Sequence, residues 1–336
     1  MSEPIDVAVV GVGYLGRLHA EKYAAHPRAR LRALVDPDPA AREVAGRLGA
    51  VWLPDWTRLP TGVRAVSVAV PTQLHHDVGC GLLRSGRDVL VEKPIAASVA
   101  EADELVAAAE AGGRILQVGH LERFNPAIRR LAGFLREPRF IESHRLAPWN
   151  VRGTDVDVVL DLMIHDIDII LNVVRSEAVA IHAAGVPVIS SSVDIANARI
   201  QFADGCVANI TASRVSAQKM RKIRVFQPDA YVSIDFLRRS AAVVRRRVAA
   251  EVGATPGLAS GADGGPAAAI VRQEVSFEDD ESDALALEID AFLEAVASRS
   301  EPPVTGRDGR RALEVANRIT EQIGLASATD GRARRG

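Results

Sequence analysis

Short apolar runs alternate with amphipathic stretches over the first part of the chain. The runs are the one that begins at Ile5 and the segments 31–35, 65–71, 88–94 and 114–120. Between two of them, segment 98–113 has a helical pattern that begins at Ser98, with Glu101 at the spacing of a capping box, and ends at Gly112 and Gly113. Strands that alternate with helices predict βαβ units and a parallel, doubly wound sheet in residues 1–120.

The pattern changes after residue 120, where strand-like runs follow one another with short turns between them. The runs are 140–147, 178–188, 194–202, 206–215 and 222–227, and two of them alternate apolar with polar residues, as a sheet with one buried face does. Amphipathic helices are expected at 282–299 and 307–324. Segment 254–269 is rich in Gly, Ala and Pro and indicates a flexible hairpin tip. We therefore expect a second domain over 121–326 and a disordered tail over 327–336.

Composition excludes several classes of protein. The chain has 336 residues, 48% hydrophobic and 25% charged, with a formal net charge of −2, so nothing favours nucleic acid as a partner. No apolar run approaches the roughly 18 residues that span a bilayer. The first residues lead directly into a strand with no export signal in view. Cys80 and Cys206 lie far apart and outside any metal-ligand spacing, so a cytoplasmic protein without disulfides or a metal is expected.

A glycine-rich turn joins the first strand to the first helix. Gly11, Gly13 and Gly16 form G-x-G-x-x-G, in which the first glycine permits the tight turn, the second lets a pyrophosphate approach the backbone and the third allows close helix–strand packing. Asp36 ends the second strand twenty residues later, where a carboxylate accepts hydrogen bonds from the adenosine ribose and repels the extra phosphate of NADP. Strand, turn, helix and acid in this order predict a dinucleotide site that prefers NAD.

The segment 158–170, VVLDLMIHDIDII, has acidic residues and a histidine within an apolar run. On a helix, Asp161 and His165 are four residues apart and point the same way. They form either a buried structural pair or a histidine that a carboxylate orients for proton transfer. Asp166 and Asp168 lie off that face by helical phase, so caps, ion pairs or a solvated edge suit them better.

Several motifs lie where parallel strands end, which is the edge at which such sheets bind ligands. They are P-T-x-x-H at Pro71, Thr72 and His75, then E-K-P at 92–94, and HLERFNP at 120–126. With G-x-G-x-x-G before them and D-x-x-x-H at Asp161 and His165 after them, the chain resembles the glucose–fructose oxidoreductase/inositol dehydrogenase (Gfo/Idh/MocA) family. The resemblance covers the chain to His165, and the strand-rich remainder is compatible with it.

The resemblance implies a Rossmann domain followed by an α+β domain with a large, open, mostly antiparallel sheet. That sheet would make a homodimer or homotetramer, and the last helices would return toward the first domain. The resemblance also implies a catalytic role for Lys93, His165 and Asp161. The cofactor contacts predicted in total are Gly11, Gly13, Tyr14, Leu15, Gly16, Asp36, Pro71, Thr72, His75, Glu92 and Lys93.

Within the family, GHLERFNPAIRRL and LDLMIHDIDIIL look most like the branch that oxidises the 3-hydroxyl of UDP-N-acetylglucosamine. Such a branch supplies a 3-keto sugar to a PLP-dependent aminotransferase for lipid A or another surface glycan. The predicted substrate contacts are Lys93, Arg123, Asn125 and His165. Arg123 and Asn125 also fit a plain helix start, with Asn125 as N-cap before Pro126, and the two interpretations are compatible.

Other functions remain open from the sequence. One is oxidation of a free polyol or sugar, as in inositol dehydrogenases, and another is a non-catalytic protein that senses NAD. The joint presence of Lys93, Asp161 and His165 argues against a sensor, which needs none of them. Candidate ligands for a diphosphate are Arg145, Arg152, Arg214 and Lys219, although most surface arginines are only solvated.

Overall fold

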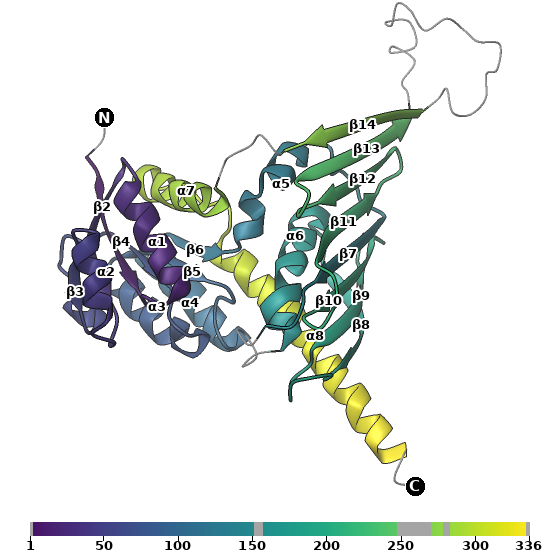
Figure 1. The fold of residues 1–336 in the computed structure, drawn as a ribbon, viewed down its shortest axis with the longest axis horizontal. Coiled ribbons are helices and arrows are strands. Elements are labelled where there is room, and N and C mark those ends of the chain that lie inside the picture. The colour runs from purple at the N-terminus through teal and green to yellow at the C-terminus, as the bar shows by residue number, and fades with distance from the viewer. Residues whose placement is uncertain (1–2, 151–156, 247–269, 278–282, 334–336) are drawn as a thin grey trace, which may run out of the picture. The chain divides into compact units, whose positions relative to one another are not determined.

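The computed structural model describes residues 3–150, 157–246, 270–277 and 283–333. The chain divides into two compact units, the first made of Met1–Asn125 and Ser282–Val315 and the second of Pro126–Glu281 and Ala316–Gly336. Figure 1 shows the elements of both units. Residues 282–315 thus return to the first unit, as the resemblance implied. The segment 254–269, expected to be a hairpin tip, lies outside the described residues.

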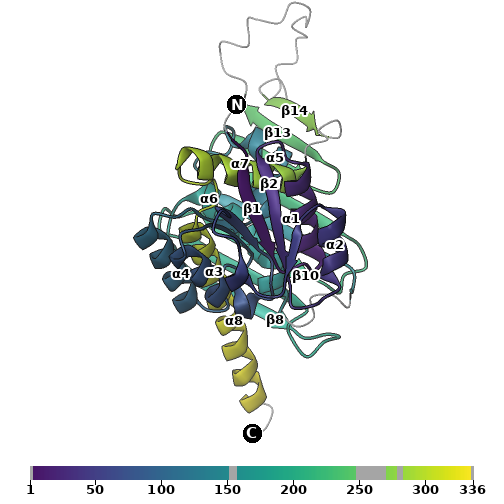
Figure 2. The same cartoon turned by 90° about the vertical axis from the view of Figure 1, so that its left-hand side faces the viewer.

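The first unit is built on a parallel sheet of six strands. In the order β3-β2-β1-β4-β5-β6, these are Val51–Leu53, Ala29–Val35, Ile5–Val10, Ala65–Val68, Asp88–Glu92 and Leu116–Gly119. The helices of this unit are α1 (Tyr14–Ala25), α2 (Ala41–Arg47), α3 (His75–Arg84), α4 (Val99–Gly112), α7 (Ala284–Ser298) and the start of α8 (Gly306–Ala333). Helices α3 and α4 pack side by side (Figure 2). The strand order reverses between β1 and β4, which is where doubly wound sheets bind dinucleotides.

Local sequence explains how these elements begin and end. The Ser98 hydroxyl accepts a hydrogen bond from the Glu101 amide at 3.2 Å, and Gly113 ends α4 with a φ of 56°. Both predicted signals of this helix are therefore confirmed. Apolar residues of β1 pack with α1 and α7 in one core, in which Tyr23 and Phe292 are fully buried.

The second unit is built on a sheet of eight strands, all antiparallel except the pair β7–β10. In the order β14-β13-β12-β11-β7-β10-β9-β8, these are Ile270–Ser276, Ser240–Arg246, Ala230–Asp235, Met220–Phe226, Phe140–Leu146, Val207–Ser213, Ile195–Phe202 and Ala178–Val186. Along β9, Ala196, Ala198 and Ile200 are buried while the residues between them are exposed. The predicted sheet with one buried face is confirmed, and helix α6 (Ile164–Val174) packs on it (Figure 1).

The end of the chain differs from the prediction. Helix α8 continues to Ala333, so residues 327–333 of the expected disordered tail are helical. This stretch has no proline, and most of its residues tolerate a helix, so it extends the amphipathic helix before it. Among the described residues, no helix combines the length and apolar character that crossing a membrane requires.

Candidate active site

The turn between β1 and α1 has the geometry that its glycines predict. Gly11 has a φ of 88°, and a Cβ there would lie 2.5 Å from the Ala69 carbonyl oxygen. A Cβ on Gly16 would lie 1.7 Å from the Gly11 oxygen, so only glycine fits at either position. At Gly13, by contrast, a Cβ would meet nothing within 4 Å, which leaves open the face that a pyrophosphate approaches. The turn therefore fits NAD as the sequence predicts.

The residues next to this turn keep groups available for a nucleotide. Tyr14 and Leu15 form the first turn of α1 and are 68% and 42% exposed. Asp36 follows β2, and its two carboxylate oxygens accept hydrogen bonds from the amides of Val12 at 2.7 Å and Asp38 at 2.9 Å. Each oxygen has a further lone pair, so the carboxylate is oriented and can still accept from a ribose hydroxyl.

The loop after β4 is tied to the E-K-P segment by His75. Pro71 precedes the short 3₁₀ turn η2 (Thr72–Leu74), and α3 begins at His75. The His75 ring nitrogens lie 2.8 Å from the Pro94 carbonyl oxygen and 2.9 Å from the Val70 carbonyl oxygen. Burial lowers the pKa of His75 against the opposing effect of these hydrogen bonds. His75 thus supports two loops at the ligand edge of the sheet, while its contact with a cofactor stays a prediction.

The end of β5 carries Glu92 and Lys93, and a residue that sequence reasoning missed holds Glu92. His19 Nε2 on α1 lies 2.9 Å from Glu92 Oε1, and the Lys93 amide donates to Glu92 Oε2 at 3.2 Å. His19 is fully buried. The signal was present in the sequence, because Gly16, His19 and Tyr23 share the face of α1 that packs on the sheet, where a histidine needs a partner.

The segment after β6 also supports the start of a helix. Helix α5 (Pro126–Leu131) begins directly after Asn125, whose side-chain amide donates to Glu122 Oε2 at 3.3 Å. Arg123 Nη2 lies 3.7 Å from an Asp308 carboxylate oxygen. The predicted helix start at Pro126 is confirmed, and the substrate contacts of Arg123 and Asn125 stay predictions.

The helical segment with Asp161 and His165 lies in the second unit and begins with an irregular turn. The Asp157 carboxylate accepts hydrogen bonds from the amides of Val159 and Leu160, both at 2.9 Å. A π-helical turn, η4 (Val159–Met163), leads into α6. Such turns are rare and often occur at functional sites. Asp161 and His165 are only partly buried on a segment whose other side chains are mostly fully buried. Both are thus accessible on it, and the contact between them stays a prediction.

Both neighbouring acids on α6 are buried, and the contacts of Asp166 are those of a structural ion pair, as the helical phase indicated. Asp166 binds Arg145 through contacts of 2.6 Å and 3.3 Å and accepts a hydrogen bond from Ser143 at 2.9 Å. Arg145, Asp166 and Asp168 are at most 3% exposed, so an ion pair rather than a solvated edge describes Asp166. Because Asp166 follows His165 directly, this pair fixes the rotation of the helix that carries His165.

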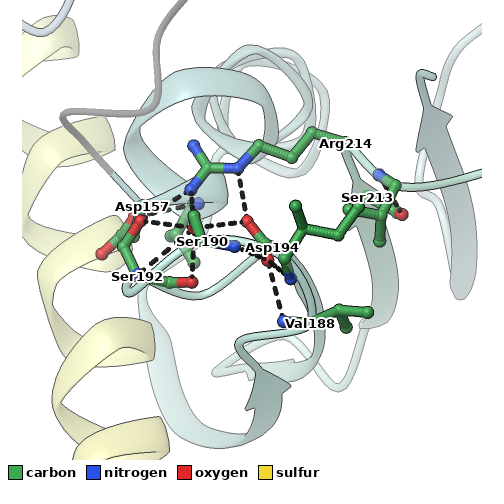
Figure 3. A network of polar contacts seen from close by, with 10 residues as sticks. Asp157, Val188, Ser190, Ser192, Asp194, Ser213 and Arg214 are labelled. Atoms are coloured by element: carbon green, nitrogen blue, oxygen red, sulfur yellow. Dashed lines mark hydrogen bonds and ion pairs between the residues drawn. The ribbon is translucent and has the colours of Figure 1, made fainter. Parts of the chain in front are cut away.

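A second buried arginine, Arg214, stabilises the loop between β8 and β9 (Figure 3). Its Nε lies 2.9 Å from Asp194 Oδ1, and its Nη2 lies 3.0 Å from Ser190 Oγ and 2.6 Å from Ser192 Oγ. Burial would raise the pKa of Asp194, but hydrogen bonds from Ser190, backbone amides and Arg214 hold that pKa well below its ordinary value. The neighbouring Val193 carbonyl accepts the Val158 amide at 3.0 Å, which connects the loop to the start of the helical segment.

These contacts change the interpretation of the cationic side chains proposed for a diphosphate. Arg145 and Arg214 are 3% and 4% exposed and bind buried carboxylates, which favours a structural role for both. Lys219 is exposed, and Arg152 lies outside the described residues.

Comparison with known proteins agrees with this architecture. Residues 5–120 match the family model of the oxidoreductase family with an NAD-binding Rossmann fold, and residues 128–232 match the GFO/IDH/MocA C-terminal domain. UDP-N-acetylglucosamine 3-dehydrogenase of Acidithiobacillus ferrooxidans is 38% identical over 314 residues, which are 93% of this chain and 95% of that protein. A structure of that enzyme superposes with a TM-score of 0.85 at 34% identity, covering 96% and 98% of the two chains.

More distant relatives are similar over most of the chain. An inositol 2-dehydrogenase of Rhizobium meliloti is 25% identical over 95% of this chain and 97% of its own. A levoglucosan dehydrogenase in complex with NADH has a TM-score of 0.82 at 16% identity, covering 96% of this chain and 98% of its own.

Proposed function

Since the chain belongs to the Gfo/Idh/MocA family of NAD-dependent oxidoreductases, we propose that it oxidises the 3-hydroxyl of UDP-N-acetylglucosamine to the 3-keto sugar. The observation that carries the proposal is the 38% identity to a UDP-N-acetylglucosamine 3-dehydrogenase over 93% of the chain. The lysine, aspartate and histidine that alcohol oxidation needs are Lys93, Asp161 and His165, and all three are present. The product is a substrate for a PLP-dependent aminotransferase, which leads to a 3-amino sugar for lipid A or another surface glycan.

The turn at Gly13 and the carboxylate of Asp36 are the groups that hold NAD in this proposal. When bound, NAD supplies the acceptor for the hydride. The chain itself manages the proton and the charge of the reacting oxygen, because a carbonyl forms only as the hydroxyl proton leaves. His165 takes that proton, and Asp161 orients the imidazole and stabilises its charged form. Lys93 holds the oxygen. In the alternative assignment the two roles are exchanged, with Lys93 as the base.

An inositol-type polyol dehydrogenase is the second candidate. It is favoured by the 25% identity to an inositol 2-dehydrogenase over 95% of the chain. The two candidates differ in the contacts that they require, because a nucleotide sugar needs groups for uridine and diphosphate whereas a polyol does not. Binding of UDP alone therefore separates them.

The test is NADH formation by the purified protein with NAD and UDP-N-acetylglucosamine, coupled to excess aminotransferase and glutamate. Coupling is needed because oxidation to the ketone is thermodynamically unfavourable, so without removal of the product the reaction reaches equilibrium after forming very little NADH. We expect sustained NADH formation that requires the UDP group, with free N-acetylglucosamine and myo-inositol inactive as controls. Oxidation of myo-inositol without UDP binding would favour the second candidate. No turnover with either substrate, despite NAD binding, would favour a sensor.

A further inference from the structure

A buried polar cluster lies beneath the E-K-P segment in the first unit. His19 on α1, Glu92 at the end of β5 and Glu288 on α7 each place a nitrogen or oxygen atom within 4.8 Å of those of the other two. His19 and Glu288 are fully buried. His19 Nδ1 also lies 3.2 Å from Ser67 Oγ, and that hydroxyl lies 2.8 Å from the Tyr23 hydroxyl. The cluster therefore joins three elements that are far apart in the sequence.

The cluster holds two carboxylates in the core, and buried charges require compensation. Burial would raise the pKa of Glu92. The hydrogen bond and charge of His19, the charge of Lys93 and the Lys93 amide outweigh burial and lower that pKa. Glu288 is a second negative charge beside His19, and together with burial it raises the pKa of Tyr23 against the hydrogen bond from Ser67. His19 is thus the imidazole that lies next to both carboxylates.

From this geometry we propose that His19 is a positioning residue, which keeps Glu92 ionised and in one orientation at the cofactor edge of the sheet. The chain of contacts is short: His19 Nε2 binds one oxygen of Glu92, and the other oxygen accepts the amide of Lys93. The inference rests on the proposed function in taking Glu92 as a cofactor contact and Lys93 as a catalytic residue. His19 itself acts only through Glu92.

A metal ion is the other occupant that one imidazole and two carboxylates could accept. The contacts favour the hydrogen-bonded arrangement instead. His19 Nε2 and Glu92 Oε1 are already in direct contact at 2.9 Å, and Glu92 Oε2 is engaged by a backbone amide. A metal bound by His19 Nε2 would have to replace its direct contact with Glu92.

Two substitutions at His19 distinguish the role of its hydrogen bond to Glu92 from the role of its side-chain volume in packing. In His19→Gln the side-chain amide reaches the position of Nε2, so it donates to Glu92 without carrying a charge. In His19→Asn the shorter amide reaches the position of Nδ1, so it serves Ser67 and leaves Glu92 without this donor. Ser67→Ala keeps His19 and removes the support of Nδ1, together with the contact between Ser67 and the Tyr23 hydroxyl.

The measurement is the dissociation constant of NAD for each full-length variant, by calorimetric titration across a range of pH. His19→Asn should weaken NAD binding about tenfold at neutral pH, because a hydrogen bond to a charged group is lost. NAD affinity falls at low pH, and the pH of this fall (the acid limb of the binding profile) should rise by about one unit, since Glu92 then faces Glu288 without the imidazole. Lys93 and His75 are the other titratable groups that interact with Glu92, and both are unchanged in every variant.

His19→Gln should bind NAD within about threefold of the wild type, because the hydrogen bond is restored. Its acid limb should still move upward, since no charge is restored. If His19→Asn does not fold, Ser67→Ala decides the question, and it should move the acid limb in the same direction by less.

His19→Asn would overturn the proposal if its affinity for NAD and the acid limb of its binding profile were those of the wild type. If His19→Asn does not fold, an unchanged pH profile of NAD binding in Ser67→Ala would overturn it. Stoichiometric zinc or manganese in the purified wild type, lost in His19→Asn, would overturn it as well, because His19 would then be a ligand. NAD binding is measured without any sugar. A wild type that binds NAD but does not oxidise the UDP-sugar therefore contradicts the proposed function and leaves this test intact.

Discussion

Replacing Arg214 by methionine distinguishes a structural arginine from a substrate ligand. Methionine keeps much of the length of the side chain but removes the guanidinium. The guanidinium is buried, with Arg214 4% exposed and Asp194 fully buried, and it binds Asp194, Ser190 and Ser192. In Arg214→Met the carboxylate of Asp194 stays in the core without its cation, so the folded state should be strongly destabilised.

The magnitude follows from what Asp194 retains. Breaking a buried ion pair by removing one partner costs about 3–5 kcal/mol. The amides of Val188, Ile189 and Ser190 still donate to Asp194 Oδ2, at 2.8, 2.6 and 2.9 Å, which favours the lower end of that range. We therefore expect a loss of about 3–4 kcal/mol in the free energy of unfolding, or a factor of a few hundred in the unfolding equilibrium.

The assay is urea denaturation followed by the fluorescence of Trp149, which lies in the second unit with its ring centroid 5.9 Å from Arg214 Cζ. Trp52 and Trp56, in the first unit, are replaced by phenylalanine in all proteins compared. The matched control is Arg272→Met on β14, where Arg272 and Glu274 form an ion pair with side chains 68% and 72% exposed. Exposed pairs contribute about 0–1 kcal/mol, so this control should unfold close to the parent.

If Arg214 binds a diphosphate, Arg214→Met should weaken UDP binding while the free energy of unfolding changes by less than about 1 kcal/mol. If the arginine is structural, stability falls and UDP affinity, measured where the variant is still folded, stays near that of the parent.

Three further predictions concern the first unit and the helix that carries His165. Lys93→Ala and His165→Ala should each still bind NAD while lowering turnover about 10²–10⁴-fold in the coupled NADH assay, and turnover equal to the wild type would contradict their assigned roles. Asp36→Ala combined with Pro37→Arg should reduce the preference for NAD over NADP by about tenfold or more in paired titrations, because a repelling charge is replaced by an attracting one; an unchanged NADP affinity would argue against the ribose contact. Burial lowers the pKa of His75 in the folded chain, so the unfolded chain binds this proton more readily. The stability that His75 contributes is therefore present above its ordinary pKa of 6.5 and is lost as the pH falls through the folded value. His75→Asn should flatten this part of the stability curve measured by urea denaturation, and an identical curve would show that His75 does not titrate in this way.

Features that depend on neighbours along the chain were predictable from the sequence alone. The order of strand, glycine turn, helix and Asp36 predicted the dinucleotide turn, because the backbone at Gly11 and the close packing at Gly16 exclude any side chain. Ser98 and Gly113 predicted both ends of α4, because helix caps depend on hydrogen bonds between residues close together in the chain. The alternation along β9 predicted a sheet with one buried face.

Contacts between residues far apart in the chain were not predictable, because they form only when the elements pack together. His19 and Glu92 are 73 residues apart, and their contact exists only because α1 packs on the sheet next to the end of β5. From the sequence, Arg214 was a candidate ligand for a diphosphate. In the structure it binds Asp194, 20 residues away, in the core. The π-helical turn at Val159–Met163 was likewise not predicted, because the periodicity of apolar residues indicates a helix without specifying its hydrogen-bonding pattern. Hydrophobic patterning tells which face of an element is buried, whereas the partner of a buried polar group is set by which elements meet there.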